Sequence, residues 1–307
     1  MRVLIGIARV ASALLGPTGI GKTALGRWLW RTYKAALPKG ESWVRVHGQK
    51  MWLNLDDRTQ LSIAVGTHEK EAFELFRAMI KPGQTVVDIG ANVGFYTLEA
   101  ARAVGPQGRV IAFEPEPNNC KRIRRNLEAN GHRNVTLCQM AVSERSGRVE
   151  LFLGSDCGIH SLLRERASGE ALEVEMVSLD DYFERHNLAP DLIKIDAEGV
   201  ELQVLRGMQR TLARYPSTAV ICEIYDPSPE VVRRKKTEAV ALLEAHGLRV
   251  SEVVAYEAST LIYASRVPLP SLQSKMNLKG SALVALLEPW ERVCLWWGST
   301  GYMPFPL

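Results

Sequence analysis

The sequence predicts an α/β protein with a doubly wound, mostly parallel sheet that carries helices on both faces. Apolar stretches typical of buried strands alternate with helical patterns of about ten to fifteen residues, as in βαβ units. In addition, the strand-like stretch 85–89 runs into two glycines, Gly90 and Gly94, and then into a helix-forming segment. That order of strand, glycine turn and helix holds nucleotide-like ligands in such folds.

The remaining elements follow from apolar periodicity and from the residues that stop it. Helices are predicted over 69–80, 96–104, 117–130, 200–214 and 229–246. Strands are predicted at 85–89, 109–113, 134–139, 191–196, 218–225, 248–256 and 259–265, with a hairpin-like strand at 148–153. Gly83, Gly131 and Gly247 mark the ends of three of the helices. The close spacing of the last two strands predicts one antiparallel strand at the edge of the sheet.

Composition indicates an ordinary enzyme with appendages. The chain has 307 residues, of which 46% are hydrophobic and 23% are charged, enough for one large domain. We expect that domain at 61–266, after a basic extension at 1–60 and before an aromatic-rich tail at 267–307. The five cysteines are scattered and form no Cys-x-x-Cys pair, which favours reduced thiols in a cytoplasmic protein.

Charge is unevenly distributed along the chain. Residues 1–40 contain seven basic side chains and no acidic one, whereas the whole chain carries a net charge of +4. The rest is therefore close to neutral, which argues against a nucleic-acid partner. The basic segment predicts either peripheral contact with an anionic membrane surface or a helix packed on the domain. It is not predicted to span a membrane, because Arg9, Gly16 and Pro17 interrupt its apolar run.

Within that segment, residues 16–23 match the P-loop pattern G-x-x-x-x-G-K-[ST]. In a P-loop nucleotide hydrolase, Lys22 would reach the terminal phosphates and Thr23 would hold magnesium. Such an enzyme also needs further parallel strands and a downstream acid, but the strands after residue 83 already build another site. A P-loop hydrolase therefore stays the alternative rather than the main hypothesis.

Two acidic residues end the first two predicted strands. Asp88 comes before Gly90, and Glu114 lies twenty residues beyond Gly94. A carboxylate at the first strand tip suits a cationic ligand, such as the amino group of S-adenosylmethionine, better than a pyrophosphate. A carboxylate at the second tip is placed to accept hydrogen bonds from ribose hydroxyls. Together they predict a nucleoside site.

The strand predicted at 191–196 contains two charged residues. Lys194 and Asp196 share one face because strand side chains alternate. Buried charges are costly unless they are paired, so one interpretation is a Lys194–Asp196 pair or a helix cap by Asp196. The functional interpretation puts Asp196 beside the ligand crevice at the carboxyl end of the sheet.

Five motifs, in order and spacing, resemble the FkbM family of S-adenosylmethionine-dependent methyltransferases. They lie at 88–97, 110–115, 126–131, 141–143 and 193–201, within a similarity that covers about residues 69–226. The resemblance implies the class I methyltransferase fold, a seven-stranded sheet with an antiparallel last strand. It also implies methylation of a hydroxyl on a sugar, a glycolipid or a polyketide-like small molecule.

The resemblance assigns roles to individual residues. Those expected to bind S-adenosyl-L-methionine are Asp88, Gly90, Asn92, Gly94, Glu114, Ala141 and Val142. Asp88 and the glycine turn would hold the methionine end, Glu114 the ribose, and residues 140–142 would border the adenine. Asp196 is the first candidate for the residue that orients the acceptor or takes its proton, followed by Glu198, Glu223 and the loop residue His160.

Two alternatives remain at this stage. Asp196, Glu198 and Glu223 could hold magnesium as oxygen ligands, although no metal is part of the main hypothesis. The chain could also be a non-catalytic, membrane-associated module that keeps the cofactor fold. The loops at 154–175 and 226–232 carry no pattern that identifies the acceptor.

Overall fold

The computed structural model describes residues 39–164, 169–256 and 258–266, together with Thr23, Trp28, Arg31 and Thr32. Most of the P-loop match and the whole tail after residue 266 therefore lie outside the described residues. No helix in the described part of the chain is long and apolar enough to cross a bilayer.

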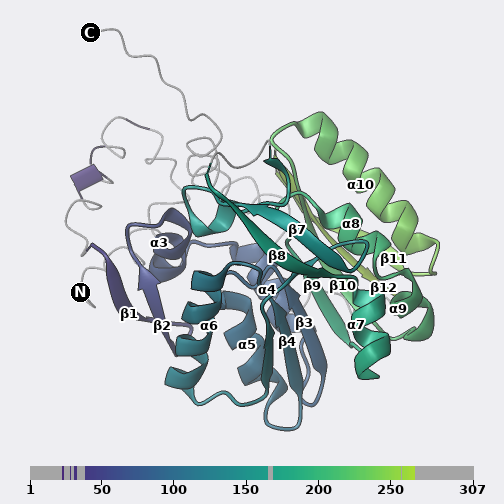
Figure 1. Cartoon of the computed structure of the whole chain (residues 1–307), viewed down its shortest axis with the longest axis horizontal. Coiled ribbons are helices and arrows are strands. Elements are labelled where there is room, and N and C mark those ends of the chain that lie inside the picture. The colour runs from purple at the N-terminus through teal and green to yellow at the C-terminus, as the bar shows by residue number, and fades with distance from the viewer. Residues whose placement is uncertain are drawn as a thin grey trace, which may run out of the picture.

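A seven-stranded sheet forms the centre of the molecule (Figure 1). Its strands, in spatial order, are β11 (Arg249–Ala255), β12 (Ser259–Ser265), β10 (Ala219–Tyr225), β9 (Leu192–Ile195), β3 (Thr85–Ile89), β4 (Arg109–Phe113) and β5 (Val135–Cys138). The five strands from β10 to β5 run parallel, and β12 is antiparallel to both of its neighbours. The predicted fold class and the antiparallel last strand are confirmed.

The predicted place of that antiparallel strand is wrong. β12 does not lie at the edge but between β10 and β11, so β11 forms the edge. The burial of the two strands explains this order: every residue of β12 is buried, whereas β11 alternates between exposed and half-buried positions. A continuous apolar strand is stabilised by neighbours on both sides, and a partly polar one tolerates the edge.

Helices cover both faces of the sheet, as predicted. One face carries α4 (Lys70–Met79), α5 (Phe95–Val104) and α6 (Pro117–Asn130), and the other carries α7 (Leu179–His186), α8 (Glu201–Arg206), α9 (Gln209–Arg214) and α10 (Pro229–Glu244). Alternate residues of each strand enter different cores: Val86 packs in the first core and Val87 in the second. Asp88 continues the Val86 series and therefore faces α5.

The helix predicted over 200–214 is two helices, α8 and α9, separated at Gly207. The backbone there passes so close to another loop that a Cβ on Gly207 would lie 2.1 Å from the carbonyl oxygen of Ser143. The carbonyl of Gly207 accepts a hydrogen bond from the backbone N–H of Asp180 at 2.8 Å, outside the helix. Tertiary packing therefore interrupts a segment whose periodicity alone favours one helix.

Two further units were not predicted. An N-terminal hairpin, β1 (Glu41–Val46) and β2 (Gln49–Asn54), precedes α3 (Arg58–Val65) and contributes Val44 and Met51 to the first core. A three-stranded sheet has the order β6 (Ala141–Val142), β8 (Ala171–Val177), β7 (Gly147–Phe152). The strand predicted at 148–153 is β7, and its partner β8 was missed along with α7.

Candidate functional site

The loop between β3 and α5 combines three left-handed residues. Gly90, Asn92 and Gly94 have φ angles of 75°, 51° and 89°. At Gly90, a Cβ would lie 1.8 Å from the backbone carbonyl oxygen of Asp196. Only glycine permits this approach, which joins the ends of β3 and β9. The predicted glycine turn thus lies directly against Asp196, the first predicted candidate for acting on the acceptor.

Asp88 is fully buried at the end of β3. Its Oδ2 accepts a hydrogen bond from the Thr97 hydroxyl at 2.6 Å, and its Oδ1 lies 3.8 Å from Nζ of Lys194 without a hydrogen bond. Burial raises the pKa of Asp88, and the Lys194 charge and the Thr97 hydrogen bond counteract only part of that effect. One acceptor atom of this carboxyl therefore still lacks a hydrogen bond.

Lys194, on β9, links that strand to the neighbouring strand β3. It is paired with Asp88 in the sheet register, its Nζ lies 3.1 Å from Oδ2 of Asp196, and it sits 4.4 Å from the centre of the Tyr96 ring. Burial lowers the pKa of Lys194, but Asp196, Asp88 and Glu69 together raise it above its usual value. The amine is therefore an ammonium, and the predicted Lys194–Asp196 pair is confirmed.

Three carboxylates meet at the carboxyl ends of β9 and β10. Glu69, Asp196 and Glu223 each offer an oxygen within 4.8 Å of the others. We call these three residues the carboxylate cluster. Asp196 and Glu223 were predicted, whereas Glu69, just before α4, was not. Glu198 is not part of the cluster: it adopts a left-handed φ of 49°, and its backbone carbonyl accepts a hydrogen bond from Ser161.

The pKa values of Glu223 and Glu69, two members of the carboxylate cluster, are shifted in opposite directions. Burial raises the pKa of Glu223 well above its usual value, and the charges of Glu69 and Asp196 raise it further. Burial would also raise the pKa of Glu69, but the charges of His68 and Lys194 and the hydrogen bond from Tyr96 outweigh it and lower the pKa. The surroundings therefore favour the protonated form of Glu223 and the carboxylate form of Glu69.

The magnesium hypothesis requires a different set of ligands from the one the fold assembles. Carboxylate oxygens are the donors that Mg²⁺ prefers, and Glu69 takes the place expected for Glu198. The ammonium of Lys194 already lies against Asp196, and both oxygens of Glu69 already contact His68 and Tyr96. These contacts supply positive charge and hydrogen-bond donors, so we assign no metal to the cluster.

Glu114 ties the glycine loop to the end of β4. Its Oε2 accepts a hydrogen bond from the backbone N–H of Asn92 at 2.8 Å, and its Oε1 accepts one from the N–H of Glu116 at 2.9 Å. Burial raises the pKa of Glu114 to about 7, despite these two bonds and one from Asn119. Oε1 also accepts from the Asn119 amide, whereas Oε2 keeps a second lone pair that can accept from a ribose hydroxyl.

Two orphaned acceptors in this region test whether S-adenosylmethionine fits. Oδ1 of Asp88 and Oδ1 of Asn92 are buried and, among the described residues, have no hydrogen-bond partner. Buried acceptors without donors are costly. An α-ammonium and two ribose hydroxyls are donors of the kind these atoms lack. The residues at the tips of β3 and β4 therefore fit this cofactor.

The other predicted residues lie at the margins of this site. Ala141 and Val142 form β6 and are buried, with Val142 packed in the second core, so their contact with adenine stays a prediction. His160 accepts a hydrogen bond from the Gly154 N–H on its Nδ1 at 3.0 Å. Burial lowers the pKa of His160, although nearby carboxylates oppose that effect. In the neutral ring Nε2 then carries the proton, so His160 is poorly arranged to accept another one.

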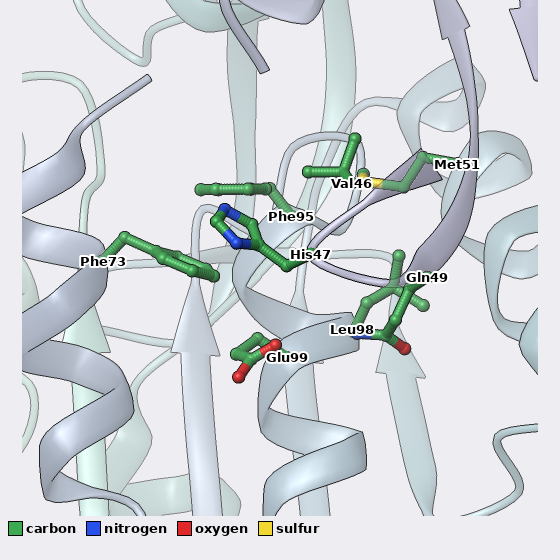
Figure 2. Close-up of a pocket in the computed structure, with 8 residues that line it drawn as sticks. All are labelled: Val46, His47, Gln49, Met51, Phe73, Phe95, Leu98 and Glu99. Carbon is green, nitrogen blue, oxygen red and sulfur yellow. The ribbon is translucent and has the colours of Figure 1, made fainter. Parts of the chain in front are cut away.

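A small cavity lies apart from these residues, between the hairpin, α4 and α5. Figure 2 shows His47 beside the rings of Phe73 and Phe95, whose centres lie 4.5 Å and 5.9 Å from the centre of the histidine ring. The cavity of about 10 Å³ has room for roughly one water molecule. None of the predicted site residues lines it, so it belongs to the packing of the hairpin.

Comparisons with known proteins agree with the motifs. The methyltransferase FkbM domain matches residues 88–250. The chain is 32% identical over 204 residues to the 31-O-demethyl-FK506 methyltransferase FkbM of Streptomyces tacrolimicus, a match covering 56% of this chain and 75% of that protein. It is 26% identical over 173 residues to the hexuronic acid methyltransferase AglP of Haloferax volcanii, covering 56% of this chain and 69% of the relative.

Among solved structures, the precorrin-6y C5,15-methyltransferase of Geobacter metallireducens is similar with a TM-score of 0.43 and 19% identity, covering 66% of this chain and 90% of the other. The family assignment follows from the sequence match, and the strand order of the sheet is consistent with it. The chain therefore belongs to the FkbM family of S-adenosylmethionine-dependent methyltransferases.

Proposed function

We propose that this methyltransferase acts on a hydroxyl oxygen of a small molecule or glycan, such as a sugar, a glycolipid or a polyketide-like compound. The observation that carries the proposal is the carboxylate cluster, which lies at the strand ends directly beside the cofactor loop. A hydroxyl must lose its proton when it is methylated, and carboxylates next to the methyl donor can orient it and collect that proton. The names of the two relatives, one with a 31-O position and one with hexuronic acid, support the same class of acceptor.

Each residue contributes a distinct step. Asp88 and Asn92 would bind the methionine end of the cofactor and Glu114 its ribose hydroxyls. When bound, S-adenosylmethionine supplies a methyl group that is already activated by a sulfonium. Asp196, held by Lys194 at 3.1 Å, orients the acceptor hydroxyl or takes its proton. Burial and the neighbouring carboxylates favour the protonated form of Glu223, in which it can donate a hydrogen bond to the acceptor.

The partner we propose is thus a small molecule or a glycan, and not a nucleic acid. Membrane contact through residues 1–40 stays a prediction, because that segment lies almost entirely outside the described residues.

Calorimetry with S-adenosylhomocysteine tests the cofactor half of the proposal. We expect the wild-type protein to bind it and Asp88→Ala or Glu114→Ala to abolish binding. Glu128→Ala, an exposed carboxylate on α6, is the matched control and should bind like wild type. Absence of binding by the wild-type protein would overturn the proposal.

Transfer of a labelled methyl group tests the acceptor half. The acceptor panel should contain a glucuronic acid glycoside, a neutral glycoside, a hydroxylated macrolide and a glycolipid, with amine and thiol compounds as competitors. Incorporation into an oxygen position supports the proposal. Incorporation only into nitrogen or sulfur compounds contradicts it while leaving the methyltransferase assignment intact.

A further inference from the structure

Glu69 is a member of the carboxylate cluster that comes from outside the matched region 88–250. It occupies the N-cap of α4 in a left-handed conformation, with φ 40° and ψ 49°. This backbone conformation costs free energy for any residue other than glycine, and such strain is concentrated at functional sites. Here the strained residue carries a carboxylate within 4.8 Å of Asp196 and Glu223.

His68, the residue before it, forms a chain of hydrogen bonds with Glu69. Nε2 of His68 lies 3.0 Å from Oε1 of Glu69, and Nδ1 lies 3.2 Å from Oγ of Ser62 on α3. The Ser62 hydroxyl donates its only proton to the carbonyl oxygen of Thr59 at 2.7 Å. Ser62 must therefore accept from His68, which places a proton on Nδ1.

The proton on Nδ1 determines how many protons the contact between His68 and Glu69 needs. With Nδ1 protonated, the 3.0 Å approach of Nε2 to a carboxylate oxygen needs one further proton, on the ring or on the carboxyl. Without it two lone pairs would face each other. The contact between His68 Nε2 and Glu69 Oε1 therefore contains one proton.

The polar and charged groups around Glu69 and His68 indicate the direction in which the pair would pass a proton. Glu69 faces the Tyr96 hydroxyl on α5, which donates to its Oε2 at 2.8 Å, and the ammonium of Lys194 on β9. Asp196 and Glu223 complete its surroundings on the sheet side. The side chain of His68 is 19% exposed. That of Glu69 is 25% exposed, so the pair connects the half-buried cluster with solvent.

We propose that Glu69 and His68 form a proton relay that carries the hydroxyl proton of the acceptor from the carboxylate cluster to solvent. This inference rests on the proposed function. As the acceptor O–H bond breaks and its oxygen bonds to the methyl carbon, the electron pair of the S–C bond stays on sulfur. The proton passes to Oε of Glu69, and the His68–Glu69 pair releases one proton to water. Asp196 then orients the hydroxyl, and Lys194 keeps Asp196 in place.

The first test detects the protons on the histidine rings directly, in the whole chain and without an acceptor. Nitrogen NMR of protein labelled at its six histidines shows which ring nitrogens carry hydrogen, and His68→Gln assigns the signal. In the wild type we expect Nδ1 to be protonated and Nε2 to be hydrogen-bonded to Glu69 at neutral pH. In Glu69→Gln we expect Nε2 to lose its proton, because the amide oxygen accepts from the Tyr96 hydroxyl and the NH2 group then donates to Nε2.

Glu74→Gln, an exposed carboxylate on the same helix that pairs with Arg77, is the control and should leave the His68 signal unchanged. The relay would be overturned if Nδ1 of His68 carried no hydrogen in the wild type. It would also be overturned if the protonation of the His68 ring were the same in Glu69→Gln as in the wild type.

The second test separates the relay from cofactor binding. Glu69→Gln should bind S-adenosylhomocysteine within about twofold of wild type but transfer methyl about 100-fold more slowly, the usual effect of losing a proton acceptor. Glu69→Asp should restore part of the rate, and His68→Gln should change the pH dependence of transfer. Wild-type transfer by Glu69→Gln overturns the relay and leaves the proposed function standing. Failure of the wild-type protein to bind or transfer refutes the proposed function, whereas the NMR result still reports on the pair.

Discussion

Oδ1 of Asp88 and Nζ of Lys194 lie 3.8 Å apart inside the protein, with the Asp88 side chain wholly buried and that of Lys194 6% exposed. The same ammonium contacts Asp196, so one cation serves two carboxylates that belong to the predicted cofactor and acceptor sides of the site. A change in the position of Lys194 on one side of the site therefore changes the electrostatic environment of the carboxylate on the other side.

Replacing that cation should destabilise the fold strongly. Lys194→Met preserves the length of the side chain but leaves Asp88 and Asp196 without their partner, and breaking a buried pair costs about 3–5 kcal/mol. Urea denaturation measures the change. Lys121→Met, on the exposed side of α6, should stay within about 0.5 kcal/mol of wild type. Equal effects of the two substitutions would contradict the buried network.

Gly90→Ala should be far more damaging than Gly105→Ala. Both glycines have positive φ, 75° and 70°, but a Cβ on Gly90 meets the carbonyl of Asp196 at 1.8 Å, whereas a Cβ on Gly105 meets nothing within 4 Å. Gly105, with a ψ of −173°, lies in a backbone region open essentially to glycine alone, so Gly105→Ala should cost about 1–3 kcal/mol of backbone strain without a clash. The difference in denaturation midpoint between the two variants isolates the clash, and similar midpoints would refute it.

Glu201 should make the protein less stable as pH rises. It is fully buried, one oxygen has no hydrogen-bond partner, and burial raises its pKa from 4.5 to about 7. The folded state binds the extra proton, so stability falls from about pH 4.5 upward and levels off above about pH 7, by roughly 3 kcal/mol. Glu201→Gln should reduce the fall by about this amount in denaturation experiments across that range, while Glu114, whose pKa is also about 7, continues to contribute a fall of its own. Glu128→Gln, on the surface, should not, and an unchanged pH profile in Glu201→Gln would contradict the assignment.

Cofactor binding should strengthen with pH until Glu114 is ionised. Ribose hydroxyls donate to the carboxylate, and burial holds the pKa of Glu114 at about 7. Below that pH the affinity for S-adenosylhomocysteine should fall by about tenfold per pH unit, and above it the affinity should be constant. Calorimetry over a pH series measures this. Glu114→Gln should bind weakly at every pH, whereas Glu201→Gln should keep the wild-type dependence, which distinguishes the two groups that titrate near neutrality.

The sequence was sufficient for the five parallel strands of the sheet and for the residues at their ends. Asp88, Glu114 and Asp196 lie where strand alternation and motif spacing predict, because a parallel sheet places its carboxyl ends along one edge. Membership of Glu69 in the cluster was not predictable. A glutamate before a helix is typical of any helix start, and only the strained backbone conformation turns it toward Asp196 and Glu223.

Segments whose structure depends on distant contacts were also missed. The break at Gly207 depends on a carbonyl of Ser143, more than sixty residues earlier in the chain. The hairpin β1–β2 is fixed by Asn126 and Asn130 of α6, whose side chains accept from the backbone N–H groups of Trp52 and Lys50. Local periodicity carries no signal for either contact.

The strand order β11-β12-β10 has a consequence for how the protein is made on the ribosome. β12 leaves the ribosome after both of its neighbours, yet it lies between them. Until residue 265 has emerged, β10 has one unpaired edge and β11 has no partner in the sheet. Nascent chains that stop before this point expose an apolar strand edge that other chains can pair with. The sheet can be completed only at the end of this domain's synthesis, so its folding yield should depend on protection of that edge until β12 arrives.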